Sequence, residues 1–108
     1  MLGEGTRQLI AVSPEVLVSV VTPWELGVEK ALGKLSFPDG LVDEVEANGF
    51  SMLSISSVHA EAAPALPLHH RDPFDRMLIA QCLCDGLTLV TADRAFDAYE
   101  VDLQDARA

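Results

Sequence analysis

Apolar positions along the chain follow two spacings, one typical of buried strands and one typical of helices. The runs Val16–Val21 and Leu87–Val90 are short and almost wholly apolar, which predicts strands covered on both faces of a parallel sheet. Helical spacing predicts helices over Leu2–Val12, Pro23–Leu32 and Asp39–Asn48. The other predicted elements are a strand over Phe50–Ile55, a helix over Ser57–Ala63 and an edge strand over Tyr99–Leu103. This alternation predicts a single α/β domain over residues 1–108, with a parallel sheet.

The strongest helix signal lies between Asp72 and Gly86. Asp72 is a favourable cap residue, Pro73 suits the first helical position, and Gly86 stands where a helix should end. Asp75 then falls at the third helical position, where a carboxylate can accept a hydrogen bond from a free backbone N–H. We therefore predict a helix that begins after the Asp72 cap and carries Asp75 in its first turn.

A second stretch repeats the order of residues in D-P-F-D. In T-P-W-E, Thr22 is the expected cap and Glu25 takes the third helical position, directly after a predicted strand. Asp93 follows another predicted strand. Ligands in open α/β sheets bind at the carboxyl ends of parallel strands, so we expect Glu25, Asp75 and Asp93 to converge in one crevice. The alternative is that each acid only caps a helix, which is the commoner use of a single acid at this position.

Clustered carboxylates favour one kind of chemistry. Their oxygens are hard ligands that suit Mg²⁺ or Mn²⁺, and a cation relieves the repulsion between like charges. Such a site can activate water and stabilise charge on a phosphate. The sequence shows no Ser/His or Cys/His pairing with motif support and no glycine-rich phosphate loop, which argues against covalent catalysis and P-loop nucleotide hydrolysis.

The charge balance limits how the protein can hold a nucleic acid. Seven basic residues face seventeen acidic ones, for a net charge of −10. A protein that binds RNA by broad phosphate neutralisation should be basic. Contact with RNA would therefore depend on metal ions and on a few arginines, of which Arg71, Arg76 and Arg94 flank the predicted site. The alternative is that these arginines balance neighbouring acids on a solvated face.

Several side chains are expected to be buried. Trp24, Val28 and Leu32 share one helical face and are predicted to be core, although a base-stacking role for Trp24 is the alternative. Cys82 and Cys84 stand two apart on one predicted helix, so their side chains diverge and neither a disulfide nor a metal site is expected. Both are predicted to be reduced and buried.

The apolar content suits a core and a partner surface rather than a membrane span. Hydrophobic residues make up 49% of the chain and the mean hydropathy is +0.24. No apolar run reaches the roughly 20 residues that a spanning helix needs, and no signal peptide opens the sequence. We expect a cytoplasmic protein without a membrane partner.

Three separated segments resemble one family. S-V-V-T-P-W-E-L-G, H-R-D-P-F-D-R-M-L-I-A-Q and L-V-T-A-D-R-A-F are similar to motifs of PIN-domain ribonucleases of the VapC toxin type. The resemblance implies a three-layer α/β/α fold with a central parallel sheet, and a metal-dependent endoribonuclease that a cognate VapB-like antitoxin holds inactive. It also implies a homodimer or a toxin–antitoxin hetero-oligomer, with Mg²⁺ or Mn²⁺ as the cofactor.

The resemblance also suggests roles for individual residues. It places Glu25, Asp75 and Asp93 in the catalytic, metal-binding site and gives Thr91 a supporting role near the metal or phosphate. Independently of the resemblance, the cap position of Asp72 makes it a supporting residue. The positive charges of Arg76 and Arg94 make these two arginines candidates for substrate binding.

The sequence departs from the family pattern at its start. The family begins with a strand that ends in an Asp, whereas this sequence opens on a segment similar to the one after that strand and its helix. We therefore expect a PIN-like domain that lacks its first strand. Three functions follow: an active ribonuclease toxin, a truncated and inactive relative that still binds an antitoxin, or a receiver module that accepts phosphate on an Asp. The early positions of Lys30 and Lys34 weaken the receiver hypothesis.

Overall fold

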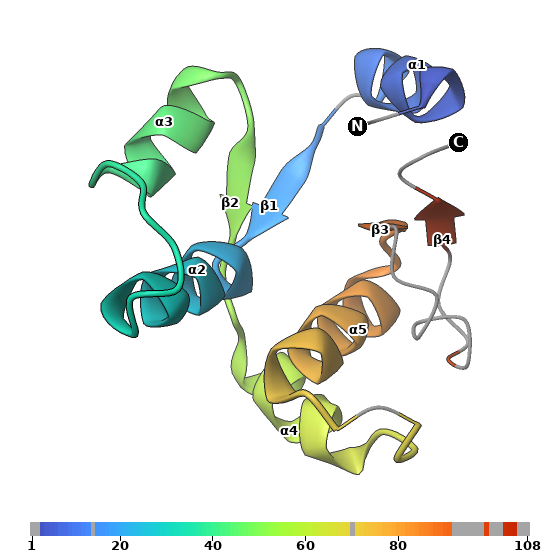
Figure 1. The fold of residues 1–108 in the computed structure, drawn as a ribbon. Coiled ribbons are helices and arrows are strands. Elements are labelled where there is room, and N and C mark those ends of the chain that lie inside the picture. The colour runs from blue at the N-terminus through green and yellow to red at the C-terminus, as the bar shows by residue number, and fades with distance from the viewer. Residues whose placement is uncertain (1–2, 14, 70, 92–98, 100–102, 106–108) are drawn as a thin grey trace. The chain divides into compact units, whose positions relative to one another are not determined.

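The computed structural model describes residues 3–13, 15–69, 71–91, 99 and 103–105. They form two compact units: Met1–Pro14 together with Ser56–Ala108, and Glu15–Ile55. Figure 1 shows the elements of each unit. Both units combine helices with parallel strands, so the α/β class is confirmed. The single domain over residues 1–108 stays a prediction.

The unit Glu15–Ile55 is built on one pair of parallel strands. β1 (Leu17–Ser19) pairs with β2 (Ser51–Leu53), with Val18 opposite Met52. Parallel strands cannot be joined by a tight turn, and the connection here carries α2 (Val21–Ala31) and α3 (Leu41–Ala47). α2 contacts β1 and α3 contacts β2, so each helix packs beside the strand nearest to it in sequence.

The start of α2 differs from the prediction. The helix begins at Val21, before the Thr22-Pro23 pair that was expected to open it. The hydroxyl of Ser19, at the end of β1, accepts a hydrogen bond from the backbone N–H of Val21 at 3.1 Å. This bond satisfies one of the free N–H groups of the first turn, so the helix can start earlier. Pro23 is tolerated there because the N–H that proline lacks would have no helical partner.

The apolar face of α2 also differs from the prediction. Trp24, Val28 and Leu32 were expected in the core, but their side chains are 56%, 38% and 66% exposed. Helical spacing places the three residues on one side of the helix, as predicted. Spacing does not determine whether that side is covered. The result is an exposed apolar face on α2.

The other unit joins the two ends of the sequence. Its elements are α1 (Glu4–Val12), α4 (Ser57–Ala65), α5 (Pro73–Asp85), β3 (Leu89–Thr91) and β4 (Leu103–Asp105). β3 and β4 are parallel, with Val90 opposite Gln104. The hydroxyl of Thr6 on α1 donates to the backbone carbonyl of Asp105 at 2.8 Å, and the Gln104 amide donates to the Thr6 hydroxyl at 3.1 Å. These bonds fasten α1 to β4.

The described strands pair in two two-stranded sheets, β1 with β2 and β3 with β4. Each strand is three residues long, shorter than its apolar run suggested. Of the strand predicted over Tyr99–Leu103, residues 100–102 lie outside the described residues, and β4 covers Leu103–Asp105. A run this short carries too little alternation to fix its boundaries from sequence.

α5 carries the core of its unit. Ile79 is fully buried and Tyr99 is 6% exposed, and Leu66, Leu89 and Leu103 pack against them. Leu83 near the end of the same helix is exposed. Buried positions on α5 run around much of the helix: Arg76, Ile79, Ala80, Gln81 and Cys82.

Both ends of α5 agree with the sequence prediction. Asp72 is the N-cap and Pro73 the first helical residue. Gly86 ends the helix with φ 65°, a left-handed conformation that glycine adopts without a steric penalty. Among the described residues, no helix combines the length and apolarity needed to cross a bilayer.

The two cysteines of α5 lie in different environments. Cys82 is buried as predicted, but Cys84 is exposed, so the prediction was wrong for Cys84. Burial, together with a smaller effect from the negative charge of Asp85, raises the pKa of the Cys82 thiol to about 11. The thiolate is the reactive form of cysteine, so Cys82 should be inert near neutral pH.

We therefore expect one fast-reacting thiol in the folded protein at pH 7.5 and two after denaturation in urea. Counting thiols with a chromogenic disulfide reagent measures this directly. The Cys84→Ser variant should lose the fast phase, and the Cys82→Ala variant should keep it. Two fast thiols in the native wild-type protein would contradict the buried position of Cys82.

Candidate functional site

The first turn of α5 is organised by the carboxylate of Asp72. Its Oδ1 accepts hydrogen bonds from the backbone N–H groups of Phe74 at 2.8 Å and Asp75 at 3.1 Å. These are two of the N–H groups that have no partner inside the helix. The cap role predicted for Asp72 is therefore confirmed, and its backbone is extended, as a cap residue requires.

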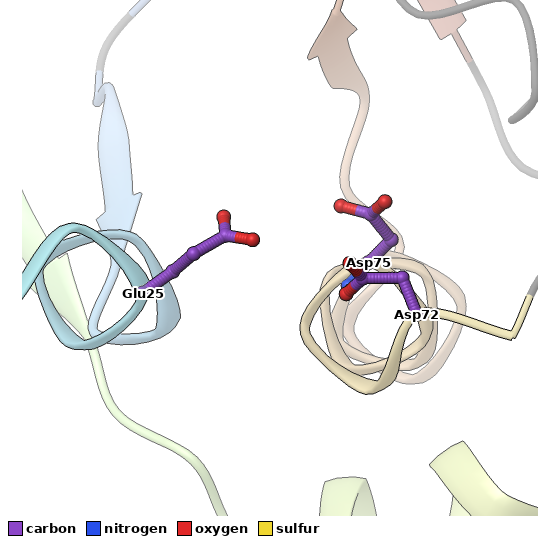
Figure 2. Close-up of side chains that lie close together, drawn as sticks. All are labelled: Glu25, Asp72 and Asp75. Atoms are coloured by element: carbon purple, nitrogen blue, oxygen red, sulfur yellow. The ribbon is translucent and has the colours of Figure 1, made fainter. Parts of the chain in front are cut away.

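Asp75 lies beside this cap, at the third position of α5. One carboxylate oxygen from Asp75 and one from Asp72 lie within 4.8 Å of each other, and both residues are half-buried. Figure 2 shows the two side chains at the start of the helix. Two negative charges this close repel each other, although water around the half-buried side chains weakens the effect. The positive end of the helix dipole offsets part of that cost.

Glu25 lies on α2, in the unit Glu15–Ile55, and is half-buried. Figure 2 draws its side chain on that helix. Because α2 starts at Val21, Glu25 is its fifth residue and not the third, so the expected match to Asp75 in helix position is wrong. Glu25 still follows β1 closely in the chain.

The remaining predicted site residues are less completely described. Thr91 is the last residue of β3, so it stands at the carboxyl end of a parallel strand, as the sequence suggested. Asp93 and Arg94 lie outside the described residues. Their places in the site stay predictions.

Arg76 does not lie on a solvated face. Its side chain is 8% exposed, and the guanidinium donates hydrogen bonds to backbone carbonyls at the end of α4. Sequence reasoning missed this role because it treated an arginine next to acids as a surface residue. The one available signal was that Arg76 lies one turn after the Asp72 cap. Side chains on a helix point back toward its N-terminus, so this side chain would extend toward the preceding loop. Substrate binding by Arg76 stays an untested prediction.

The sequence profile described as "PIN domain" matches residues 3–102. The chain belongs to the PIN domain family. No curated protein matched the chain. PIN domains are generally nucleases and typically use a divalent metal, so membership indicates a nuclease.

The acid pair of this PIN domain suits such a metal. Asp72 and Asp75 offer carboxylate oxygens, which are the ligands that Mg²⁺ and Mn²⁺ prefer. A cation would also relieve their mutual repulsion. Asp72 has a second task, because its Oδ1 already binds two backbone N–H groups. The pair is therefore asymmetric: Asp72 holds the helix start, and Asp75 is the better candidate for the metal.

The cap predicts a measurable stability difference. Asp72→Ala leaves the N–H groups of Phe74 and Asp75 without their acceptor and should lower the free energy of unfolding by about 0.5–2 kcal/mol. Asp72→Ser keeps a side-chain oxygen at the cap and should recover most of that loss. Urea denaturation followed by circular dichroism measures both. An Asp72→Ala variant as stable as the wild type would show that the cap carries little of the stability.

Proposed function

We propose that this PIN domain is a metal-dependent endoribonuclease, the toxin of a toxin–antitoxin pair that acts in the cytoplasm. The observation that carries the proposal is the pair of half-buried carboxylates at the start of α5 in a chain of this family. The fit of these oxygens to a hard divalent cation supports the metal requirement.

The proposed site combines acids from three parts of the chain. Asp75 lies on α5 and Asp72 is its N-cap, and we propose that Glu25 of α2 and Asp93 complete the set. The sequence supports Glu25 and Asp93, because each follows a strand closely and matches a motif of the resemblance. When bound, Mg²⁺ or Mn²⁺ would neutralise the acids, activate a water and stabilise charge on the phosphate.

The chain's own residues have separate tasks in this proposal. Asp75 holds the cation, and Asp72 fixes the backbone from which Asp75 projects. Thr91 sits at the end of β3, two residues before Asp93 in the sequence, and would support the metal or phosphate. Arg71 is exposed and can meet the RNA backbone, as Arg94 is proposed to do. A net charge of −10 leaves few other groups to attract RNA.

Asp75→Asn removes one negative ligand while keeping nearly the same shape. RNA cleavage in Mg²⁺ or Mn²⁺ should fall at least about a hundredfold, equivalent to about 2.7 kcal/mol of transition-state stabilisation. Mn²⁺ affinity in calorimetry should fall as well. The matched control is Asp43→Asn, because Asp43 is the third residue of α3 but is exposed. That variant should cleave RNA as the wild type does.

Chelation gives a second check on the same proposal. Excess EDTA should abolish cleavage, and added Mn²⁺ should restore it. For the variants, an equal loss of RNA cleavage in Asp43→Asn and Asp75→Asn would count against a specific metal site at Asp75. No cleavage by the wild type with any divalent cation would favour the alternative of an inactive relative that binds an antitoxin.

We also propose a small antitoxin partner that places an apolar helix on the exposed face of α2 and brings basic groups to the acids. The exposed side chains of Trp24, Val28 and Leu32 supply the apolar surface. The charge of −10 favours a basic partner. One helix laid across another is a common way to bury such a stripe.

Co-expression with the protein encoded by the adjacent small open reading frame tests this partner. The two chains should copurify, and Leu32→Asp should weaken the complex because it places a charge in the apolar contact. The control is Val58→Asp on α4, which changes another well-exposed apolar side chain, 61% exposed against 66% for Leu32. If the two chains copurify and neither substitution weakens the complex, the contact lies elsewhere on the protein. If the wild-type chains do not copurify, the antitoxin proposal is wrong.

A further inference from the structure

The buried guanidinium of Arg76 joins α5 to the end of α4. Nη2 donates to carbonyl oxygens of the last turn of α4 and of the residue after it, and Nη1 donates to the following loop and to a tyrosine hydroxyl. The acceptors are Ala63 O at 3.0 Å, Pro64 O at 3.3 Å, Leu66 O at 2.9 Å, Pro67 O at 3.1 Å and Tyr99 Oη at 3.4 Å. Tyr99 in turn donates to Pro67 O at 2.9 Å.

These hydrogen bonds provide donors for backbone carbonyls at the end of α4. The last carbonyls of a helix have no partner within it, and a buried one needs a donor from elsewhere. A cation is also favourable at the negative end of the helix dipole. The planar guanidinium carries five N–H donors in a fixed fork, which lets one side chain serve several carbonyls. A lysine ammonium has three donors on one atom and cannot span the same set.

The same residue is tied to the acid pair. The backbone N–H of Arg76 donates to the carbonyl of Asp72 at 3.0 Å, and Arg76 directly follows Asp75. Its side chain meanwhile holds Leu66 and Pro67, where the connection toward Asp72 begins. Arg76 therefore restrains the start of α5 through its backbone and the start of the incoming loop through its side chain.

We propose that Arg76 is a positioning residue for the Asp72–Asp75 pair, acting through the connection between α4 and α5. This inference rests on the proposed metal-dependent function. It gives Arg76 a task other than substrate binding, because the guanidinium is buried against protein oxygens. Groups that orient metal ligands without touching the ion typically change metal affinity when they are removed.

The opposite end of the same helix pair offers a matched control. His59 is 2% exposed at the start of α4, and its Nε2 lies 3.0 Å and 3.1 Å from the two carboxylate oxygens of Asp85, the last residue of α5. The two helices pack side by side (Figure 1), so this contact also joins them. It does so at the end of α5 that is remote from Asp72 and Asp75.

The experiment compares Arg76→Lys, Tyr99→Phe and Asp85→Asn. Lysine retains the positive charge, so any effect on the metal reports lost geometry and not lost charge. Thermal unfolding gives the stability of each variant, and calorimetry with Mn²⁺ alone gives its affinity at a temperature where circular dichroism shows every variant folded. We expect all three to unfold at lower temperature. Arg76→Lys should bind Mn²⁺ about tenfold or more weakly, Tyr99→Phe should bind it more weakly by a smaller factor, and Asp85→Asn should match the wild type.

The outcomes separate this inference from the function on which it rests. If the wild type binds Mn²⁺ and Arg76→Lys binds it equally well, Arg76 only stabilises the fold. If Asp85→Asn weakens binding as much as Arg76→Lys does, the effect follows general loss of stability and positioning is overturned. Should Arg76→Lys fail to fold, Tyr99→Phe decides the matter in the same way against Asp85→Asn. A wild type that binds no Mn²⁺ overturns the proposed function and this inference together.

Discussion

The Asp72 cap is the interaction on which the first turn of α5 depends. Asp72 and Asp75 bring oxygens within 4.8 Å of each other while half-buried. Left to themselves, such side chains would turn apart toward water. Asp72 cannot do so freely, because its Oδ1 is held by two backbone N–H groups. The cap therefore does more than start a helix, since it keeps one charge next to another.

Contacts of neighbouring residues on α5 hold this first turn in place. Ile79, one turn after Asp75 on α5, packs with Tyr99 in the core, and the Arg76 side chain bonds the end of α4. Polar and apolar contacts thus meet on α5 within a few residues. The cap at Asp72, the core around Ile79 and the buried guanidinium of Arg76 therefore act together to hold the start of α5.

The parts that sequence predicted well are those with local causes. The effects of Asp72-Pro73 and of Gly86 on the backbone are confined to a few neighbouring residues. Both ends of α5 could therefore be predicted from these residue types. The start of α2 did not, because the Ser19 hydroxyl competed with the expected Thr22 cap. Both residues are good acceptors for a free N–H, and sequence alone gives no reason to prefer the earlier one.

The parts that sequence predicted poorly depend on contacts between distant segments. Periodicity grouped Trp24, Val28 and Leu32 correctly but could not show that the face is exposed. The burial of Arg76 depends on carbonyls of α4, which no spacing rule connects to it. For the site itself, Asp72 and Asp75 followed from one local motif. Adding Glu25 or Asp93 requires long-range information that a single sequence does not contain.

The order of the chain has a consequence for how the protein reaches its folded state. Glu15–Ile55 is one continuous segment, and every contact within it is available once residue 55 has been made. The unit that carries Asp72 and Asp75 is split, and the bond between Thr6 and Asp105 spans 99 positions. Contacts of that separation carry a loop-closure entropy that local contacts avoid, and they form late. During synthesis α1 must therefore wait for β4 to emerge, so the acid-bearing unit is completed only after residue 105 has been made.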